Sequence, residues 1–289
     1  MTWFGSADDA AARLRTQGYL PDDSSAMSAY LAGELGKPLL VEGPAGVGKT
    51  ELAKAVAAAC DAELVRLQCY EGLDEARALY EWNYKKQLLR IQAAPEDREW
   101  SETHDDIFAE EFLLSRPLLT AIRRDGPTVL LIDEVDKTDI EVEGLLLEVL
   151  SDFQVTIPEL GTVAATRRPF VLLTSNATRE LSEAVKRRCL YLYLDYPDAQ
   201  REREIVESRV PGVDARLAAH VVEVVGRLRG LDLKKSPSLA ESVDWARTLL
   251  ALGASGRKGV DDATIKATLG VVLKHRSDLD KAVRELKLG

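Results

Sequence analysis

The amino-acid sequence predicts an α/β protein with a parallel sheet, followed by a small all-helical lid. Short apolar runs alternate with helical patterns up to Pro197, and a glycine-rich loop joins the first of these runs to a helix. From Asp198 onward every pattern is helical. Alternating strands and helices are typical of a parallel α/β sheet. We therefore expect an α/β core over residues 1–197 and a helical lid over residues 198–289.

Composition excludes several classes of protein. The chain has 289 residues, of which 46% are apolar, so a substantial core is available. Its 38 basic and 48 acidic residues give a net charge of −10, which argues against a chain that mainly coats nucleic acid. The start of the chain lacks the pattern of a signal peptide, and no apolar run reaches the roughly 18 residues of a membrane span. A cytoplasmic protein without a membrane span is expected.

Two helices are expected ahead of the first strand. Ser6 with Asp9 three residues later is typical of a helix start. Asp22 or Asp23 can cap the second helix, and Gly36 is placed to end it. An apolar strand then leads directly into the glycine-rich loop.

The loop over residues 43–50, GPAGVGKT, fits the phosphate-loop template GxxxxGK(S/T). Glycines let the backbone approach a triphosphate, and N–H groups at a helix start favour an anion. Lys49 is expected to reach the β- and γ-phosphates and the Thr50 hydroxyl to bind Mg²⁺. The alternative, a glycine-rich turn without a ligand, is disfavoured by the order strand, loop, helix. The candidate ATP-binding residues are Gly43, Pro44, Ala45, Gly46, Val47, Gly48, Lys49, Thr50, Glu51 and Asp133.

A second strand is expected over residues 63–69, followed by a weakly patterned stretch that ends near residue 92 and contains several aromatic residues. These aromatic residues could form a base-stacking surface, or a helix and hairpin packed on the domain. Acidic surroundings favour the second interpretation. Residues 93–106 are polar and charged, so an exposed loop is expected there.

An acidic pair follows the next buried strand. Residues 129–132 are all apolar, as in a strand covered on both faces. Asp133 and Glu134 come directly after it, where ligands bind in open α/β sheets. Asp133 is expected to hold Mg²⁺, and Glu134 to act as the general base that activates an attacking water. A solvated turn would explain such a pair alone, but the phosphate loop in the same chain favours a site.

A polar amide follows a further strand. After a helix over residues 139–151 and a hairpin over residues 153–168, the apolar strand 169–174 leads to Asn176. Its side chain can hydrogen-bond the attacking water or the γ-phosphate. An Asx turn explains the strand end equally well.

Two arginines end the short helix predicted over residues 180–186. Arg187 and Arg188 precede the strand 189–194. At a helix C-terminus they can be partners of the helix dipole or solvated charges. Their other interpretation is an arginine finger that reaches the γ-phosphate held by a neighbouring subunit.

The remaining chain is expected to be helical. Apolar residues recur at helical spacing over residues 221–228, 239–249 and 265–273. Ser238 with Glu241 has the pattern of a capping box at the start of the second of these helices.

In this order, the motifs resemble those of AAA+ ATPases and, more narrowly, of the MoxR family. The likeness extends from about Tyr19 to the last helix. Two segments, Tyr70–Asp74 and KRRCLYLYLDYP, most resemble the CoxD-type branch found beside carbon monoxide dehydrogenase genes. The matching stretches are PLLVEGPAGVGKTELAKA, YEGLDEARALYEWNY, FLLSRPLL, LLIDEVDK, PFVLLTSN and LSEAVKRRCLYLYLDYP.

The resemblance implies a ring-shaped ATPase, usually a hexamer, that uses ATP and Mg²⁺ to remodel or mature other proteins. It implies a partner with a von Willebrand A domain and, for the CoxD-type branch, a client metalloenzyme such as a molybdenum hydroxylase. It assigns Asn176 to sensor 1 and Arg188 to the arginine finger, with Arg187 as second choice. Residues 71–92 become the helix-2 insert, and residues 153–168 become the hairpin before sensor 1.

Two departures from the MoxR pattern stand out. Many relatives read DEINRA where residues 133–138 read DEVDKT. Many also carry a sensor-2 arginine at the start of a lid helix, where this chain has Ser238. Lys234, Lys235 and Arg247 are candidates to replace that arginine.

The expected reaction is hydrolysis of ATP to ADP and phosphate, coupled to work on a protein client. A nucleic-acid motor or loader is the alternative from another class, and the acidic balance weighs against it. A slow nucleotide-dependent binding switch is a third possibility, which Glu134 argues against. A small-molecule kinase is disfavoured by the same water-activating glutamate and by the lid.

Overall fold

The computed structural model describes residues 2–93, 106–254 and 260–288. The predicted exposed loop over residues 93–106 therefore lies, apart from its two ends, outside the described residues. The chain forms two compact units. The first comprises Met1–Gln17, Pro21–Glu42 and Thr50–Tyr193, and the second Gly18–Leu20, Gly43–Lys49 and Leu194–Gly289.

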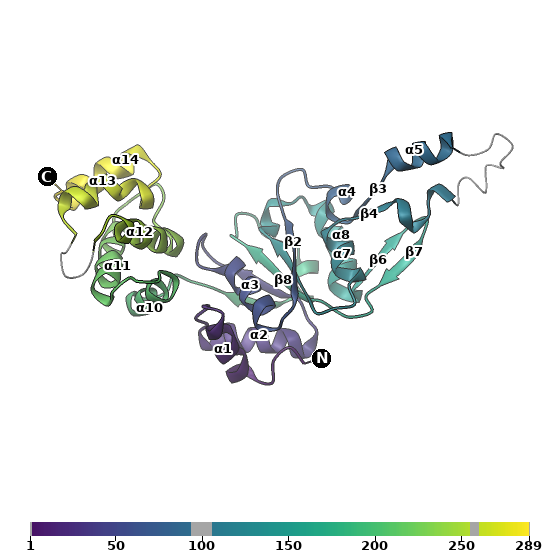
Figure 1. The fold of residues 1–289 in the computed structure, drawn as a ribbon, viewed down its shortest axis with the longest axis horizontal. Helices are drawn as coiled ribbons and strands as arrows, with labels where there is room; N and C mark the ends of the chain where they lie inside the picture. The colour runs from purple at the N-terminus through teal and green to yellow at the C-terminus, as the bar shows by residue number, and fades with distance from the viewer. Residues whose placement is uncertain (1, 94–105, 255–259, 289) are drawn as a thin grey trace. The chain divides into compact units, whose positions relative to one another are not determined.

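Figure 1 shows the elements along the chain. In order they are α1 (Ala7–Thr16), α2 (Asp23–Leu35), β1 (Leu39–Glu42), α3 (Lys49–Ala59), β2 (Glu63–Gln68), α4 (Glu75–Ala78), β3 (Tyr80–Trp82), α5 (Tyr84–Gln92), η1 (Glu110–Phe112), β4 (Leu113–Ser115), α7 (Pro117–Arg123), β5 (Thr128–Asp133), η2 (Val135–Lys137), α8 (Ile140–Asp152), β6 (Gln154–Ile157), β7 (Gly161–Ala164), β8 (Phe170–Ser175), α9 (Glu183–Lys186), β9 (Leu190–Tyr193), α10 (Ala199–Arg209), α11 (Ala215–Arg229), α12 (Leu239–Ala251), α13 (Asp262–Val272) and α14 (Arg276–Glu285).

The main sheet of the first unit has five strands in the order β2-β5-β8-β1-β9, and every neighbouring pair is parallel. Helix α2 contacts β1 and β9, and α7 contacts β2 and β5. All residues of β5 are buried, as its apolar run predicts. The predicted α/β fold with a parallel sheet is confirmed. Because the strands are parallel, they all end at one edge, the carboxyl edge, and all begin at the opposite one, the amino edge.

Local sequence sets the helix boundaries ahead of the sheet. The Ser6 hydroxyl accepts from the Asp9 amide at 3.1 Å, and the Asp22 carboxylate accepts from the Ser25 amide at 2.7 Å. Gly36 ends α2 in the left-handed region, with φ of 58°. These caps confirm the expected helix starts and fix the chain direction into β1.

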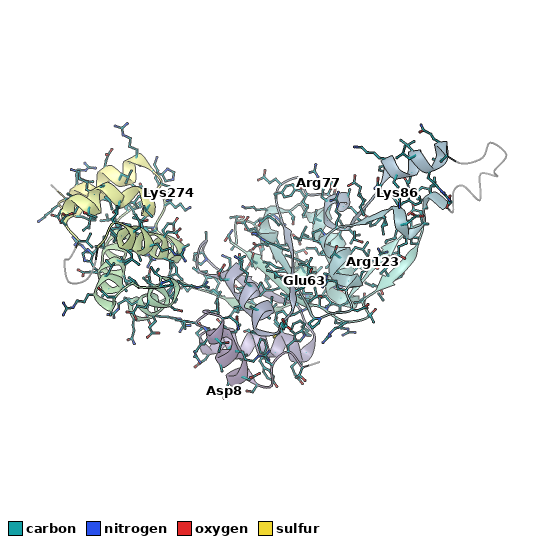
Figure 2. The ribbon with its side chains drawn as sticks, viewed as in Figure 1. Asp8, Glu63, Arg77, Lys86, Arg123 and Lys274 are labelled. Atoms are coloured by element: carbon teal, nitrogen blue, oxygen red, sulfur yellow. The ribbon has the colours of Figure 1, made fainter. Side chains whose placement is uncertain are left out.

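The pairs β3–β4 and β6–β7 form two separate antiparallel sheets of two strands each. Helix α5 lies beyond the β3–β4 ribbon in Figure 1. Lys86 on α5, labelled in Figure 2, donates to the Glu111 carboxylate at 2.6 Å. The Trp82 ring of β3 packs edge-on against Phe108, with centroids 5.1 Å apart. Tyr80 and Trp82 thus pack on the domain, as the second of the two interpretations holds, whereas Tyr84 on α5 is exposed.

Helix α9 begins at Glu183, three residues later than predicted. The Ser182 hydroxyl caps the helix by accepting from the Val185 amide at 3.4 Å. The Ser182 amide donates outward to the Glu143 carboxylate at 2.9 Å. This contact holds the preceding residues out of the helix.

In the second unit, helices α10 to α14 surround a buried apolar core. Trp245 is fully buried, and its indole N–H donates to the Thr268 hydroxyl at 2.8 Å. Helix α12 starts at the predicted capping box of Ser238 and Glu241. The helical lid expected from the sequence is therefore present as a set of packed helices.

Candidate functional site

The phosphate loop over residues 43–49 follows β1 directly and requires its glycines. Gly43, Gly46 and Gly48 have φ values of 152°, 77° and 103°. A Cβ atom at Gly43 would lie 1.9 Å from the Leu194 carbonyl oxygen, and one at Gly46 would lie 2.3 Å from the Ser238 hydroxyl. Side chains are excluded at both positions by backbone conformation and by space.

Lys49 is the cation of this loop. Its side chain is almost buried, and its ammonium donates to the carbonyl oxygens of Gly43 and Pro44 at 2.6 and 2.7 Å. Phosphate oxygens form stronger, charge-assisted hydrogen bonds than these carbonyl oxygens do. The loop is thus suited to a polyphosphate. Pro44, Ala45 and Val47 complete it, with Val47 buried.

The carboxylate of Asp133 is held by three donors at the carboxyl edge. Its Oδ1 accepts from the Thr50 hydroxyl at 3.0 Å and from the Thr174 hydroxyl at 2.5 Å. Its Oδ2 accepts from the Arg66 guanidinium at 2.5 Å. The structure therefore brings together Thr50 and Asp133, the two residues predicted to hold a metal ion.

This donor set fits Mg²⁺. A hydroxyl and a carboxylate are hard oxygen ligands, and Mg²⁺ is usually held by one or two protein ligands together with substrate phosphates. Among the described residues there is no cluster of three or more acidic, histidine or cysteine side chains that would form a cage of protein ligands alone. Thr50 and Asp133 would therefore share the ion with the nucleotide.

Glu134 follows Asp133 in a strained backbone conformation. Its φ of 58° and ψ of 47° lie in the left-handed region, which residues other than glycine rarely adopt. The Thr174 hydroxyl accepts from the Glu134 amide at 2.8 Å and helps to hold this conformation. Such strain is typical of functional sites.

The Glu134 carboxylate meets Asn176, as the sequence-based roles require. Its Oε1 accepts from the Asn176 amide nitrogen Nδ2 at 3.4 Å. Its Oε2 accepts from Gln68 at 2.9 Å and from Lys137 at 2.6 Å. The contact at Oε1 is long and weak, so Oε1 is the oxygen best able to accept a proton from a water molecule.

Asp136 fixes the position of Asn176. Its carboxylate accepts from the backbone amides of Asn176 and Thr178 at 3.2 and 3.0 Å and from the Thr178 hydroxyl at 2.5 Å. Burial alone would raise the pKa of Asp136, but these hydrogen bonds outweigh it and lower the pKa below its usual value. Asp136 is thus a charged anchor between η2 and the end of β8.

Sequence reasoning missed four residues that hold the acidic pair, namely Arg66, Gln68, Lys137 and Thr174. Arg66 and Gln68 alternate along β2, and Gln68 pairs in register with Asp133 of β5. The alternation is visible in the sequence. Its meaning depends on β2 being the neighbour of β5, which only the folded sheet reveals.

The predicted arginines lie at the opposite edge of the sheet. Arg188 is two residues ahead of β9, and its guanidinium donates to the Ser151 hydroxyl and to the Ala184 carbonyl oxygen, the latter at 2.8 Å. Arg187 is 81% exposed in its side chain, and its ion pair with Glu183 is long, at 3.8 Å. A four-residue strand spans about 13 Å, so neither arginine belongs to the acidic group at the carboxyl edge.

Four other sequence-based candidates, namely Glu51, Arg247, Lys234 and Lys235, are engaged by other residues of the chain. The Glu51 carboxylate pairs with Lys54 along α3 at 2.7 Å, so its contact to nucleotide stays a prediction. Arg247, a candidate replacement for the sensor-2 arginine, bonds Asp244 and the Arg209 carbonyl oxygen, both at 3.2 Å. Backbone amides of the other candidates, Lys234 and Lys235, donate to Asp278.

Residues 39–193, more than half of the chain, match the family described as "ATPase family associated with various cellular activities (AAA)". The chain belongs to the AAA ATPase family. It is an ATPase. Among the described residues, no helix of this AAA ATPase is long and apolar enough to cross a membrane.

Similar proteins support the same assignment. The ATPase is 25% identical over 293 residues to the protein NorQ of Paracoccus denitrificans, covering 95% of this chain and 97% of NorQ. It is 33% identical over 144 residues to the chaperone protein ClpB 1 of Nostoc, covering 49% of this chain and 14% of ClpB 1. A mutant of RuvB from Thermotoga maritima shares the fold, with a TM-score of 0.51 and 16% identity over 92% of this chain and 72% of that chain. The predicted MoxR type is confirmed, whereas the CoxD-type branch stays a prediction.

Proposed function

We propose that this AAA ATPase uses ATP hydrolysis to remodel a protein client, and that the client is a metalloenzyme under assembly, such as a molybdenum hydroxylase of the carbon monoxide dehydrogenase type. The observation that carries the proposal is the apolar face of α5. Tyr84, Leu88 and Ile91 follow helical spacing on one face, and they are 62%, 59% and 39% exposed. Leu89 beside them is 66% exposed. Grouped exposed apolar side chains of this kind favour a protein partner.

The charges of α5 favour a protein client over nucleic acid. Lys86 pairs with Glu111 at 2.6 Å, and Arg90 pairs with Asp106 at 2.7 Å. Nucleic-acid binding depends on cations that neutralise phosphates, and two of the three cations of α5, all but Lys85, are already neutralised by carboxylates. The nucleic-acid motor is therefore the weaker candidate.

The proposed reaction is in-line attack of water on the γ-phosphate. Amides of the phosphate loop and Lys49 bind the β- and γ-phosphates, and Oε1 of Glu134 takes the proton of the attacking water. Asn176 hydrogen-bonds that water and holds Glu134 in place. Mg²⁺, held by Thr50 and Asp133, would polarise the phosphoryl oxygens. Release of phosphate removes the negative charge that the phosphate loop binds. The ATPase then presents a different conformation to the client.

A ring completes the site in this proposal. Arg188 lies at the amino edge, so it can stabilise the γ-phosphate only of nucleotide held by another copy. A contact between two different faces of identical subunits closes into a ring when the rotation permits. We infer a hexamer in the cytoplasm, where ATP is available, working with a partner that carries a von Willebrand A domain.

A client-capture experiment tests this function. Glu134→Gln should bind ATP without hydrolysing it, so in ATP it should retain client in a pull-down followed by mass spectrometry. The double variant Leu88→Asp/Leu89→Asp in the Glu134→Gln background should lose the client. Ile140→Asp, which changes another exposed apolar residue, is the matched control. Equal capture by the α5 double variant and the control would contradict the proposal.

Filter binding at low salt tests the competing function. Real phosphate contacts give nucleic-acid affinity with a steep dependence on salt. We expect no retained single- or double-stranded DNA or RNA beyond the level of an acidic control protein. Tight, salt-sensitive retention would favour the nucleic-acid motor.

A further inference from the structure

Three cations precede three neighbouring strands of the main sheet. Lys37 is two residues ahead of β1, Arg168 two residues ahead of β8 and Arg188 two residues ahead of β9. The strands lie in the order β8-β1-β9 and run parallel. Topology therefore gathers these three side chains at the amino edge, although they are far apart in the sequence.

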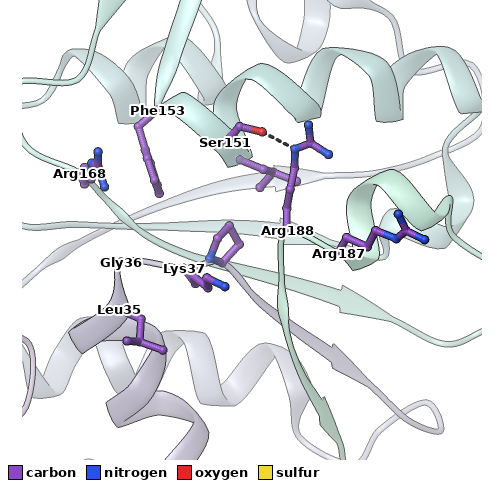
Figure 3. Close-up of a pocket in the computed structure, with 10 residues that line it drawn as sticks. Leu35, Gly36, Lys37, Ser151, Phe153, Arg168, Arg187 and Arg188 are labelled. Atoms are coloured by element: carbon purple, nitrogen blue, oxygen red, sulfur yellow. Dashed lines mark hydrogen bonds between the residues drawn. The ribbon is translucent and has the colours of Figure 1, made fainter.

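The same three cations, together with Arg187, line one pocket, which we call the amino-edge pocket (Figure 3). Its volume is about 350 Å³, and Phe153 and Pro38 supply part of its apolar wall. In Figure 3, Lys37 lies between Arg168 on one side and Arg188 on the other, and the Arg187 guanidinium extends away from them. Cations thus approach the pocket from opposite sides.

The pocket is preorganised by contacts to neutral groups. Arg188 is fixed by the Ser151 hydroxyl and the Ala184 carbonyl oxygen, and the Arg168 guanidinium lies over the Phe153 ring, 5.2 Å from its centroid. In the described part of the chain, neither Lys37 nor Arg168 forms an ion pair with a carboxylate. Unneutralised cations of this kind attract a multiply charged anion, and arginine favours phosphate oxygens in particular.

We propose that the amino-edge pocket binds the terminal phosphate of the nucleotide held by a second copy of this chain, and that Arg168 and Lys37 contact it together with Arg188. The proposal rests on the ring assembly in the proposed function, since a copy cannot bring this edge of its sheet to its own phosphate loop. It adds two trans-acting residues to the arginine finger and makes the finger one part of a three-cation site.

The test uses purified full-length variants. Arg168→Ala and Lys37→Ala should each lower kcat for ATP hydrolysis about tenfold, the effect of losing one charge-assisted hydrogen bond. Their affinity for ATP, measured by calorimetry in the Glu134→Gln background, should stay unchanged because the phosphate loop is intact. Arg168→Lys should recover part of the loss. Arg15→Ala, which removes an exposed cation from α1, is the matched control and should behave as the wild type.

Assembly supplies a second readout. In the Glu134→Gln background with ATP, Arg168→Ala should need about tenfold more protein to associate, as seen by analytical ultracentrifugation. Thermal melts by circular dichroism identify any variant that fails to fold. If Arg168→Ala does not fold, the same measurements are made on Arg168→Lys. Normal kcat and assembly for Arg168→Ala and Lys37→Ala, with Arg188→Ala inactive, would overturn the pocket while leaving the proposed function standing. A wild-type protein that does not associate in ATP would overturn both.

A free anion is the other source of a phosphate group. Titration of orthophosphate into Lys49→Ala, which lacks the cation of the phosphate loop, separates the two sources. Weak or absent heat together with the kcat losses above supports the neighbouring nucleotide as the source. Saturable heat that disappears in Lys49→Ala/Arg168→Ala, with kcat unchanged in Arg168→Ala, would assign the pocket to a free anion and overturn the proposal.

Discussion

The two edges of the main sheet differ in charge and in how completely their side chains are engaged. At the carboxyl edge, each oxygen of the Asp133 and Glu134 carboxylates accepts at least one hydrogen bond from the surrounding side chains. At the amino edge, the hydrogen bonds of Arg188 to other described residues are to neutral groups, and Arg187 is mostly exposed. The carboxylates of the carboxyl edge are fully hydrogen-bonded within the chain. The cations of the amino edge are available to an anion from another molecule.

This difference indicates that one copy carries two halves of different sites. Parallel strands place polar residues at both ends of the sheet. The carboxyl edge carries carboxylates suited to a metal ion and a water molecule, whereas the amino edge carries cations suited to an anion. In the acidic half, Glu134, the proposed water-activating residue, already contacts the Asn176 amide. In the proposed function, the basic half becomes catalytic only when a second copy brings phosphate to it.

Lys49→Ala is expected to have the largest effect. The loop loses the cation that reaches the β- and γ-phosphates, so ATP binding should fall below detection and hydrolysis with it. Calorimetry with ATP measures the affinity, and Lys54→Ala on the exposed side of α3 is the control. An unchanged affinity of Lys49→Ala for ATP would show that this loop does not bind the nucleotide.

Arg188→Ala tests the amino edge. An arginine supplied in trans typically accelerates hydrolysis by about 10³–10⁵-fold, so kcat should fall by roughly that range while ATP affinity stays near the wild-type value. Steady-state phosphate release and calorimetry give the two quantities. If Arg187→Ala shows the loss and Arg188→Ala does not, Arg187 is the finger.

Glu134→Gln separates binding from chemistry at the carboxyl edge. Glutamine keeps size and polarity but cannot accept a proton, so turnover should fall by about 10²-fold or more with ATP still bound. Glu141→Gln at the exposed start of α8 is the matched control. Wild-type turnover in Glu134→Gln would require another general base.

Asp136→Asn should have the smallest effect, on stability and its dependence on pH. Burial raises the pKa of Asp136, but hydrogen bonds from Thr178 and the Asn176 amide lower it further, below its usual value of 3.8. A lowered folded-state pKa means that the carboxylate stabilises the fold above about pH 4, and that this contribution is lost as the pH falls through the folded-state value. Urea unfolding should therefore show Asp136→Asn to be less stable than the wild type near pH 7. The gap should narrow below about pH 4, and a gap independent of pH would contradict the ionised anchor.

Sequence reasoning reached the fold and the acidic half because both follow local rules. The buried run of β5 and the loop glycines are set by packing and backbone conformation, which residues 43–50 and 129–134 display directly. Gln68 and Arg66 could not be found in this way, because their contacts depend on β2 lying next to β5. Arg168 and Lys37 were missed for the same reason. Each is an ordinary surface cation in the sequence, and only the strand order brings the two together.

Mixing two inactive variants tests whether the two edges cooperate between copies. Arg188→Ala keeps an intact phosphate loop, and Lys49→Ala keeps an intact amino edge, so one type of mixed interface combines both. After subunit exchange, confirmed by native mass spectrometry, the mixture should recover part of the wild-type hydrolysis rate. Mixed assemblies that form but hydrolyse ATP only at background would contradict the account, and would leave Arg188 with a structural role at the end of α9.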